Sequence, residues 1–378
     1  MVKRWGFCAI LVLCLAGGLC LPAAATDAGF SALPEEYVAL ESYLPKSLSG
    51  ILPEGLFDPD PQRVQEALSQ LTSFSGFIGV VLQAVGLHLE ECGALLASVL
   101  GLLLLCGMMR ALGQVWSMNH ASLVPRLCLY LAIAGAGYAA VDAMLDYFSS
   151  LQTLMQGMIP LMSTMYLLGG NAARASVGNV MLSVGLNVCH SVCAGLAPPL
   201  FGACMAMALP AVMESGVDLA RVSGFLKKGY TTVLGILTLV LTLCLSAQNL
   251  IASRADSLAM RSGRYAIGQM IPVVGGALAG SLDTLAAGIG LLRGLAGMSG
   301  VLLLLIGCLP VLVRMLLLRG LFDLGSGIAH LLGCASESAL LGEAGSLFGY
   351  MAAAVAMCTA VFIIAVGAFA SCAAAWVT

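Results

Sequence analysis

The chain has 378 residues, of which 60% are hydrophobic and only 9% are charged, with a formal net charge of −3. Its mean hydropathy of +1.01 excludes a soluble globular protein, because soluble domains carry about 25% charged residues. The small net charge, without a basic stripe among aromatic residues, argues against a nucleic-acid partner. The composition therefore predicts an all-α polytopic membrane protein embedded in lipid, with 45 glycines available for close helix packing.

The N-terminus has the three parts of a secretory signal peptide. Lys3 and Arg4 precede an apolar run over residues 5–21, and a small-residue cleavage signal ends at Ala25. We expect cleavage between Ala25 and Thr26, which places the mature N-terminus outside the cytoplasm. A retained first membrane helix is the alternative.

An acidic segment follows, and we expect it to be exported. Prolines interrupt any long helix before residue 62. Beyond that point Val64, Leu68 and Leu71 recur at helical spacing, which predicts an amphipathic helix on the outer face or against other helices. The segment is too short and too broken to build an enzyme core. We interpret it as a docking segment.

Membrane spans need about 20 mostly apolar residues each. Two further stretches, 154–170 and 271–292, are apolar and carry an Ile-Pro pair, so they are full spans, broken helices or re-entrant hairpins. The sequence thus predicts seven to nine transmembrane helices. The seven clearer candidates are 93–112, 127–147, 177–195, 196–213, 230–250, 295–318 and 346–374.

The chain also contains an internal similarity. Met158-Ile159-Pro160 recurs 112 residues later as Met270-Ile271-Pro272, and Pro198 matches Pro310 at the same offset. We interpret this as a duplication of residues 150–260 as 262–372. The predicted divisions are a signal peptide (1–25), the exported segment (26–92), two spans (93–150) and two repeat units (151–260 and 261–378).

Loop charges suggest how the two units are related. The loop 214–229 ends with basic residues, whereas its counterpart near 325–345 carries Glu337 and Glu343 and no Lys or Arg. Because basic loops favour the cytoplasmic side, this difference suggests opposite sidedness. Three spans, an odd number, would separate the two loops. The pattern therefore indicates the inverted repeat that many transporters have.

Few residues suggest chemistry. Asp283 and Arg314 lie in or beside predicted spans, where ionisable groups usually face a cavity or a partner. They could pair with each other, or Asp283 could meet water at the interface. Together with Pro160, Pro272 and Pro310 they form the predicted set of intramembrane polar and hinge positions.

Other combinations carry weaker signals. His88 with Glu90 and Glu91 is best explained as a solvated boundary, and Cys189 with Cys193 as packing residues, because no further metal ligands are found nearby. Walker A, H-E-x-x-H and G-x-S-x-G motifs are missing. We predict no catalytic, cofactor-binding or metal-binding residues, and hence no enzyme.

Several blocks of the second half carry a family resemblance. They are Arg261-x-x-Arg264-Tyr265, Ile271-Pro272-Val273-Val274-Gly275, Ser281-x-Asp283-Thr284, Leu309-Pro310 and the apolar run 346–370. Together with the leader and the two Ile-Pro pairs, these blocks resemble the stage III sporulation protein AE family. The resemblance implies membership of the A-complex, which with stage II sporulation protein Q forms a channel-like apparatus between mother cell and forespore.

The resemblance further implies a multi-pass location in the mother-cell membrane around the forespore. It also implies a separate ATPase subunit as the energy source, and a role in late forespore development. Our leading hypothesis is therefore a non-enzymatic membrane subunit of this channel or secretion apparatus, whose partners are the other A-complex proteins and lipid. The alternative is a self-sufficient secondary transporter built on the inverted repeat. An intramembrane enzyme using Asp142 and Asp146 is disfavoured.

Overall fold

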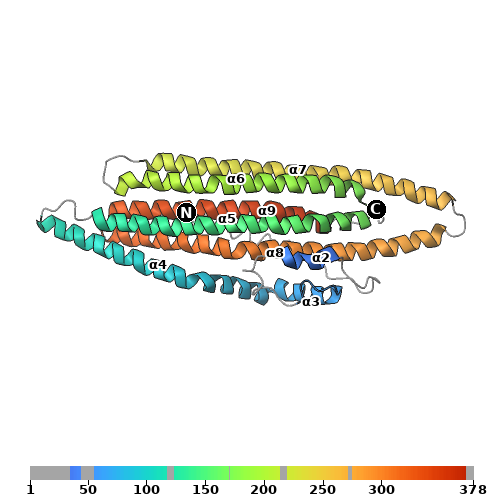
Figure 1. Cartoon of the computed structure of the whole chain (residues 1–378), viewed down its shortest axis with the longest axis horizontal. Helices are drawn as coiled ribbons and strands as arrows, with labels where there is room; N and C mark the ends of the chain where they lie inside the picture. Colours follow the sequence, from blue (N-terminus) through green and yellow to red (C-terminus); the bar gives the residue numbers. More distant parts are fainter. Residues whose placement is uncertain are drawn as a thin grey trace.

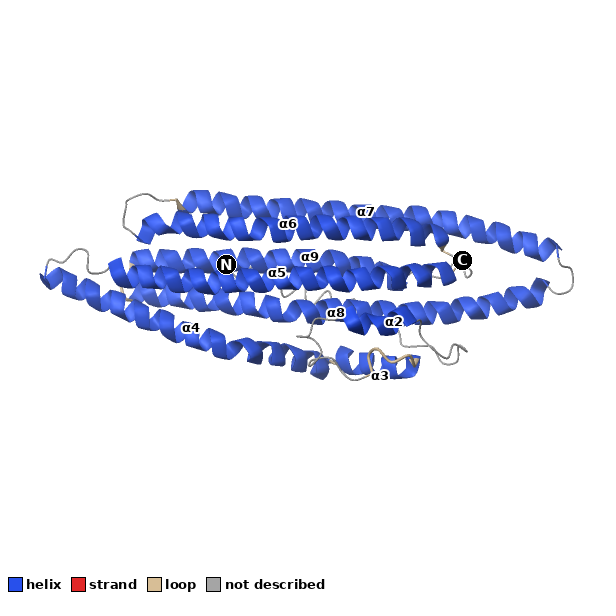
Figure 2. Ribbon diagram, in the orientation of Figure 1, coloured by secondary structure: helices blue, strands red, loops and turns tan. Residues whose placement is uncertain are grey.

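The described part of the chain is a bundle of long helices. The computed structural model describes residues 35–43, 55–116, 123–169, 171–212, 219–270 and 275–371, without the side chains of 248–289 and of a few positions near helix ends. No strand occurs in these ranges (Figure 2). The six long helices are α4 (Phe74–Trp116), α5 (Leu123–Leu168), α6 (Ala172–Val212), α7 (Ala220–Met270), α8 (Gly275–Leu331) and α9 (Ala335–Ser371).

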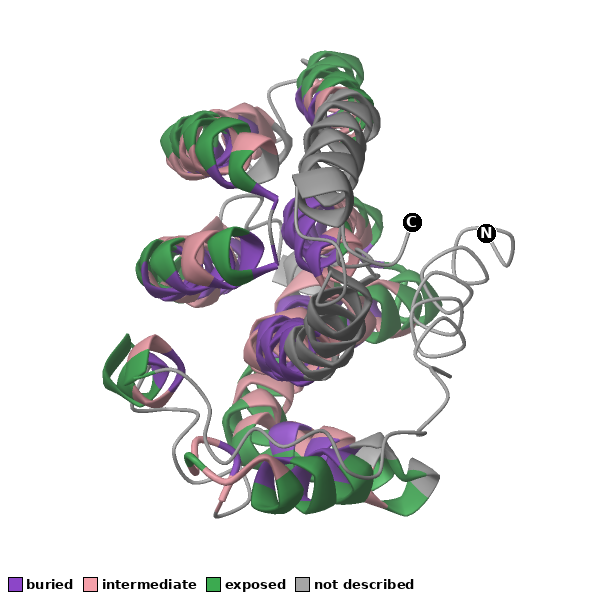
Figure 3. Cartoon of the chain, turned by 90° about the vertical axis from the view of Figure 1, so that its right-hand side faces the viewer, coloured by how far each residue is buried: buried purple, intermediate pink, exposed green. Residues whose placement is uncertain are grey.

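Consecutive long helices run in opposite directions along one elongated bundle (Figure 1). The most extensive contact joins α8 and α9, and α5, α6 and α7 pack in sequence beside them. Burial identifies the centre, because 61% of the apolar window of α9 is buried but only 17% of that of α7. Buried residues face the middle of the bundle and exposed residues its outside (Figure 3).

Each long helix contains a segment apolar and long enough to cross a membrane, which gives six candidate spans in the described residues. The chain is thus an all-α polytopic membrane protein, as its composition predicts. At 1.5 Å per residue, helices of 37 to 57 residues are about 55–85 Å long. They are longer than the hydrocarbon layer of about 30 Å and extend beyond it.

Several spans that the sequence analysis separates belong to single helices. Helix α5, which ends at Leu168, contains both 127–147 and most of 154–170. Helix α6, which ends at Val212, likewise contains 177–195 and nearly all of 196–213. The same holds for 275–292 and 295–318 in α8. Pro160, whose Ile-Pro pair suggested a break, lies inside α5, and Pro198 and Pro310 lie inside α6 and α8. Membrane helices tolerate such prolines because neighbouring groups satisfy the freed carbonyls. The count in the described residues is therefore six, below the seven to nine predicted.

The helix continuity also changes the predicted divisions. The boundaries after residues 92, 150 and 260 fall inside α4, α5 and α7. They were placed by apolar stretches and by the repeat, neither of which marks where a helix ends. The residues of the signal peptide, including Ala25 and Thr26, lie outside the described ranges.

The described parts of the acidic segment fold against the bundle as α2 (Glu35–Ala39), the 3-10 helix η1 (Leu40–Tyr43) and α3 (Pro61–Thr72). Asp60 caps α3 by accepting a hydrogen bond from the Gln62 N–H. Val64, Leu68 and Leu71 are buried, as an amphipathic helix requires. In front of α3, the Asp60 N–H donates to the Asp58 carboxylate and lowers its pKa.

Two aromatic residues anchor this segment. Tyr37 is fully buried and donates a hydrogen bond to the Leu56 carbonyl at 2.7 Å, and burial raises the pKa of Tyr37 to about 12. The ring of Tyr43 lies so close to Gly157 of α5 that a Cβ there would be 2.8 Å from it. The glycine therefore lets η1 lie directly on α5, and the segment packs on the bundle instead of extending away from it.

The two proposed repeat units run in the same direction. The hairpin of α6 and α7 corresponds to the hairpin of α8 and α9, since Pro198 and Pro310 lie inside α6 and α8. Two helices, α7 and α8, separate the two connections, and both connections lie at the same end of the bundle (Figure 1). The inverted repeat was inferred by counting 271–292 and 295–318 as two spans. In the structure, residues 275–292 and 295–318 belong to the single helix α8. The arrangement is parallel.

Candidate functional site

A cavity of about 220 Å³ lies near the middle of the bundle, between α4, α5 and α8. Asp146 is at the midpoint of α5, and Arg314 is close to the midpoint of the apolar part of α8. The residues that line the cavity are His88, Ala143, Asp146, Tyr147, Ser150, Leu151, Leu154, Leu303, Leu304, Gly307, Pro310, Val311 and Arg314.

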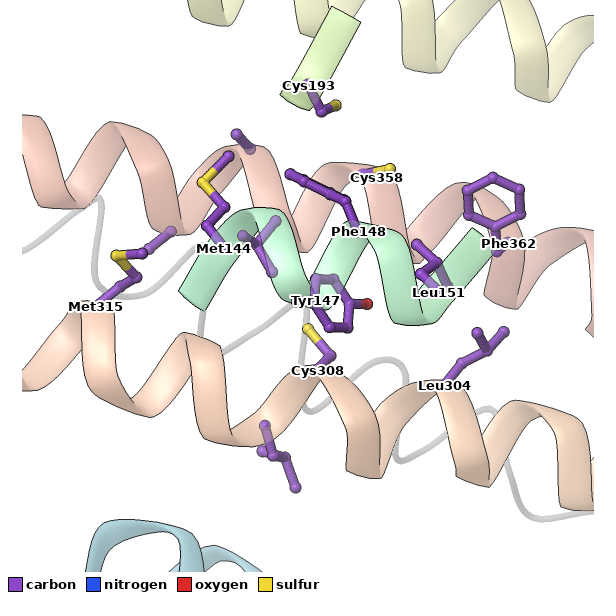
Figure 4. Close-up of a cluster of buried hydrophobic side chains, with 14 of the residues drawn as sticks. Met144, Tyr147, Phe148, Leu151, Cys193, Leu304, Cys308, Met315, Cys358 and Phe362 are labelled. Atoms are coloured by element: carbon purple, nitrogen blue, oxygen red, sulfur yellow. The ribbon is translucent and has the colours of Figure 1, made fainter. Parts of the chain in front are cut away.

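The inner wall of the cavity belongs to the packed core. Tyr147 of α5 lies toward Cys308 of α8, with Leu151 and Leu304 beside them (Figure 4). The Tyr147 hydroxyl and the Thr359 hydroxyl are 2.6 Å apart, and Thr359 hydrogen-bonds the Cys308 thiol at 3.4 Å. This polar contact fixes three helices behind the cavity.

The local sequence explains why space remains here. Gly307 has no side chain, and Pro310 has no N–H to donate to the Ile306 carbonyl, so α8 fills less volume and makes fewer internal hydrogen bonds at this level. Only His88 of α4 lines the cavity, and the apolar window of this helix is only 22% buried.

Polar side chains from all three helices line the cavity, and Glu91 of α4 lies beside it. Arg314 and Glu91 of α4 form an ion pair at 3.6 Å, with 24% and 66% of their side chains exposed. His88, one turn earlier on α4, has a buried Nδ1 atom without a hydrogen-bond partner in the described residues. Asp146 and Ser150 lie one turn apart on α5, and the described residues give neither side chain a hydrogen-bond or ion-pair partner.

The structure brings two of the predicted positions together, since Pro310 and Arg314 both line the cavity. Pro160 lies farther along α5 on an exposed face and away from it. Pro272 falls outside the described residues, and the side chain of Asp283 is also outside them.

A pair of Asp283 and Arg314, one of the two alternatives for Asp283, does not fit the helix. Both residues belong to α8, which is one continuous helix from Gly275 to Leu331. Thirty-one residues of helix separate them by about 46 Å. Arg314 instead pairs with Glu91, which the sequence analysis placed at a solvated boundary.

The sequence did not place His88, Asp146 and Ser150 at a common cavity. A usable signal was present: Asp142, Asp146 and Ser150 recur at four-residue spacing along an apolar helix, and so share one face. Nothing in the sequence showed that this face meets α8 near Arg314.

A second group of charges lies where α4, α6 and α8 finish and α5, α7 and α9 begin, which we call the basic end. Arg126 of α5 donates to Glu337 of α9 at 2.8 Å, and the two side chains are only 3% and 2% exposed. Arg110 of α4 lies 3.6 Å from the same carboxylate. Nearby, Lys227 of α7 pairs with Glu343 of α9 and donates to Ser346 at 2.7 Å.

These pairs explain why the loop charges were misleading. Glu337 and Glu343 made the loop near 325–345 look acidic and therefore oppositely placed. In the structure, both carboxylates neutralise basic side chains of the same end, Arg126 and Lys227. They carry no information about a different side of the membrane.

Cys189 and Cys193 of α6 have a third cysteine next to them. Cys358 of α9 lies beside Cys189 and Cys193. The described residues contain no group of three or more His, Cys, Asp or Glu side chains that could hold a metal ion. All three thiols are buried in the apolar core, where cysteine acts as a small packing residue.

A bundle of six long apolar helices in the described residues defines a multi-pass α-helical membrane protein. The family model described as Stage III sporulation protein AE matches residues 63–373, and the chain belongs to this family. It is similar to Stage III sporulation protein AE of Bacillus subtilis (strain 168), with 22% identity over 280 residues, covering 72% of this chain and 69% of that protein. No solved structure matches.

Proposed function

We propose that this chain is a non-enzymatic, membrane-embedded subunit of the A-complex, the channel or secretion apparatus between mother cell and forespore. The observation that carries the proposal is the family match over residues 63–373, which covers nearly all of the described bundle. The chain would act in the mother-cell membrane around the forespore, beside the other A-complex proteins and a separate ATPase, and indirectly with stage II sporulation protein Q.

The distribution of charge supports an orientation for this role. Arg110, Arg126, Arg221, Lys227 and Lys228 gather at the basic end, and basic residues favour the cytoplasmic side. The acidic helix α2 and the helix α3 pack away from that end, α2 on α5 and α3 on α4 and α8 (Figure 1). The basic end would then meet a cytoplasmic ATPase, and α3 would face the space between the two membranes.

The exposed face of α3 offers a test by co-purification. Glu66 and Gln70 are exposed, opposite the buried face that holds Val64 and Leu68. We expect the tagged wild-type chain to co-purify with the other A-complex proteins from sporulating cells. Replacing Glu66 and Gln70 by lysine should reduce the recovery of partners from the intermembrane space, while the chain itself remains folded.

Lys228→Glu provides the matched control, because Lys228 is also exposed but lies at the basic end. This variant should retain the intermembrane partners. Recovery of the wild-type chain without any A-complex protein, under conditions that preserve the ATPase assembly, would contradict the proposed function.

A self-sufficient secondary transporter is the second candidate, and the observation that favours it is the cavity at mid-bundle, whose lining includes His88, Asp146 and Arg314. The two candidates predict different behaviour of the purified chain. Reconstituted alone in vesicles, a transporter moves a solute down or against an applied ion gradient. A channel subunit shows no such movement without its partners.

A further inference from the structure

The cavity between α4, α5 and α8 presents two unlike polar sides within an apolar surrounding. One side, from α5, accepts hydrogen bonds, and the other, from α4 and α8, is mainly cationic or hydrogen-bond donating. Ionisable groups inside a membrane protein usually serve a ligand, an ion or one another. The question is which ligand chemistry satisfies both sides.

The accepting side consists of Asp146 and Ser150. They lie at i and i+4 on α5 and so project from one face of the helix. Both line the cavity, where Asp146 is exposed and Ser150 is half-buried, and neither side chain has a hydrogen-bond partner among the described residues. A carboxylate beside a hydroxyl is suited to bind an ammonium group.

The donating side consists of Arg314 and His88. The guanidinium has five N–H donors in a planar fork that fits a carboxylate. Its ion pair with Glu91 is long, at 3.6 Å, and the Glu91 side chain is 66% exposed. Such a pair contributes little, so a ligand carboxylate can replace Glu91 at low cost. The Nδ1 of His88, buried and without a partner in the described residues, lies on the same side.

The rest of the lining is apolar: Leu151, Leu154, Leu303, Leu304 and Val311. An engineered apolar cavity of about 150 Å³ holds benzene, so a cavity of about 220 Å³ holds a somewhat larger molecule. We propose that this cavity binds a small zwitterion with an apolar side chain, an apolar α-amino acid, with its ammonium on Asp146 and Ser150 and its carboxylate on Arg314.

Single-charge ligands fit the site less well. A metal cation or an amine would meet the guanidinium of Arg314, and an inorganic or organic anion would meet the carboxylate of Asp146. A zwitterion places each of its charges beside the opposite one. The proposal concerns binding alone, and it stands whether the chain transports the ligand or responds to it within the complex.

The experiment uses the purified full chain in lipid nanodiscs and radiolabelled leucine, alanine and phenylalanine. For the amino acid that binds most tightly, competition is then measured with its amide, which lacks the carboxylate, and with its deaminated acid, which lacks the ammonium. We expect each analogue to bind at least about tenfold more weakly than the amino acid, because each leaves one charged group of the cavity, Asp146 or Arg314, without its opposite charge.

Variants connect each charge of the ligand to one side of the cavity. Asp146→Asn should remove the discrimination between the amino acid and its deaminated acid. Arg314→Met should remove the discrimination between the amino acid and its amide. Asp142→Asn and Arg319→Gln, which change charges one turn or more outside the cavity lining, should leave the affinities unchanged.

Several results would overturn the proposal. One is an amide or a deaminated acid that binds as tightly as the amino acid. Another is Asp146→Asn protein with unchanged selectivity. A third is wild-type protein, folded by its melting curve, that binds none of the three amino acids at millimolar concentration. A loss of binding in Arg314→Met is interpreted only if the melting curve of this variant matches that of the wild type. If it does not match, Ser150→Ala is the second variant, and we expect it to lower the affinities for the amino acid and for its amide equally.

Discussion

At the scale of single residues, the pair of Arg126 and Glu337 carries the largest electrostatic consequence. Both side chains are almost completely buried, so removing one of them leaves a desolvated charge with less compensation. We expect Glu337→Gln to lower the free energy of unfolding by about 3–5 kcal/mol. Thermal unfolding of the purified protein in detergent, followed by intrinsic fluorescence, measures the change.

A matched surface pair provides the control. Arg319 and Asp323 are 3.6 Å apart on α8, with 28% and 51% of their side chains exposed. Asp323→Asn should therefore cost only about 0–1 kcal/mol. Replacing Arg126 and Glu337 together by methionine should recover most of the stability lost in Glu337→Gln. Equal losses of unfolding free energy in Glu337→Gln and Asp323→Asn would show that burial does not increase the cost of removing one partner.

The sequence could predict that such charges need partners, but not which partners they have. Arg126 and Glu337 are 211 positions apart, and Arg314 finds Glu91 on a helix near the start of the bundle. Intramembrane charge is costly enough to be noticed from one sequence. The identity of each partner depends on how six helices are arranged in space, which local patterns do not contain.

At the scale of helices, the contact of α8 with α9 depends on a backbone approach at Gly297. A Cβ added there would lie 2.3 Å from the Cβ and 2.8 Å from the Cα of Ala370. Because a Cα cannot rotate away, the two helices must separate. We expect Gly297→Ala to destabilise the protein by about 1–3 kcal/mol, measured as a lowered melting temperature.

Gly294 on the same helix is the control, since an added Cβ would meet nothing within 4 Å. Gly294→Ala should stabilise α8 by about 0.5–1 kcal/mol, because glycine is a poor helix residue. The two substitutions thus have opposite expected signs. A melting temperature for Gly297→Ala at or above that of Gly294→Ala would exclude close packing at this contact.

Helices themselves were the most predictable feature, and their ends the least. Apolar stretches marked all six long helices, because few other structures satisfy the backbone in lipid. Their lengths were underestimated, since Pro160 was taken as a possible break and lies inside α5, and Pro310 lies inside α8. The amphipathic spacing of Val64, Leu68 and Leu71 correctly located α3.

At the scale of the whole molecule, the relation of the two hairpins decides the topology. Both connections, between α6 and α7 and between α8 and α9, lie at the basic end (Figure 1). An inverted repeat would place them on opposite sides of the membrane. The predicted inverted topology and the observed parallel topology differ because α8 is one helix, whereas its sequence was counted as two spans.

Site-specific proteolysis tests this arrangement. A protease recognition site is inserted before Leu219, in the turn at 332–334, or between α7 and α8, and cleavage is measured in right-side-out and inverted vesicles. Because α7 and α8 each cross once, the first two sites should be cut from the same side and the third from the other. The basic residues near the first two sites predict that their side is the cytoplasmic one. Cleavage of the first two sites from opposite sides would restore the inverted repeat and would require α8 to be interrupted within the membrane.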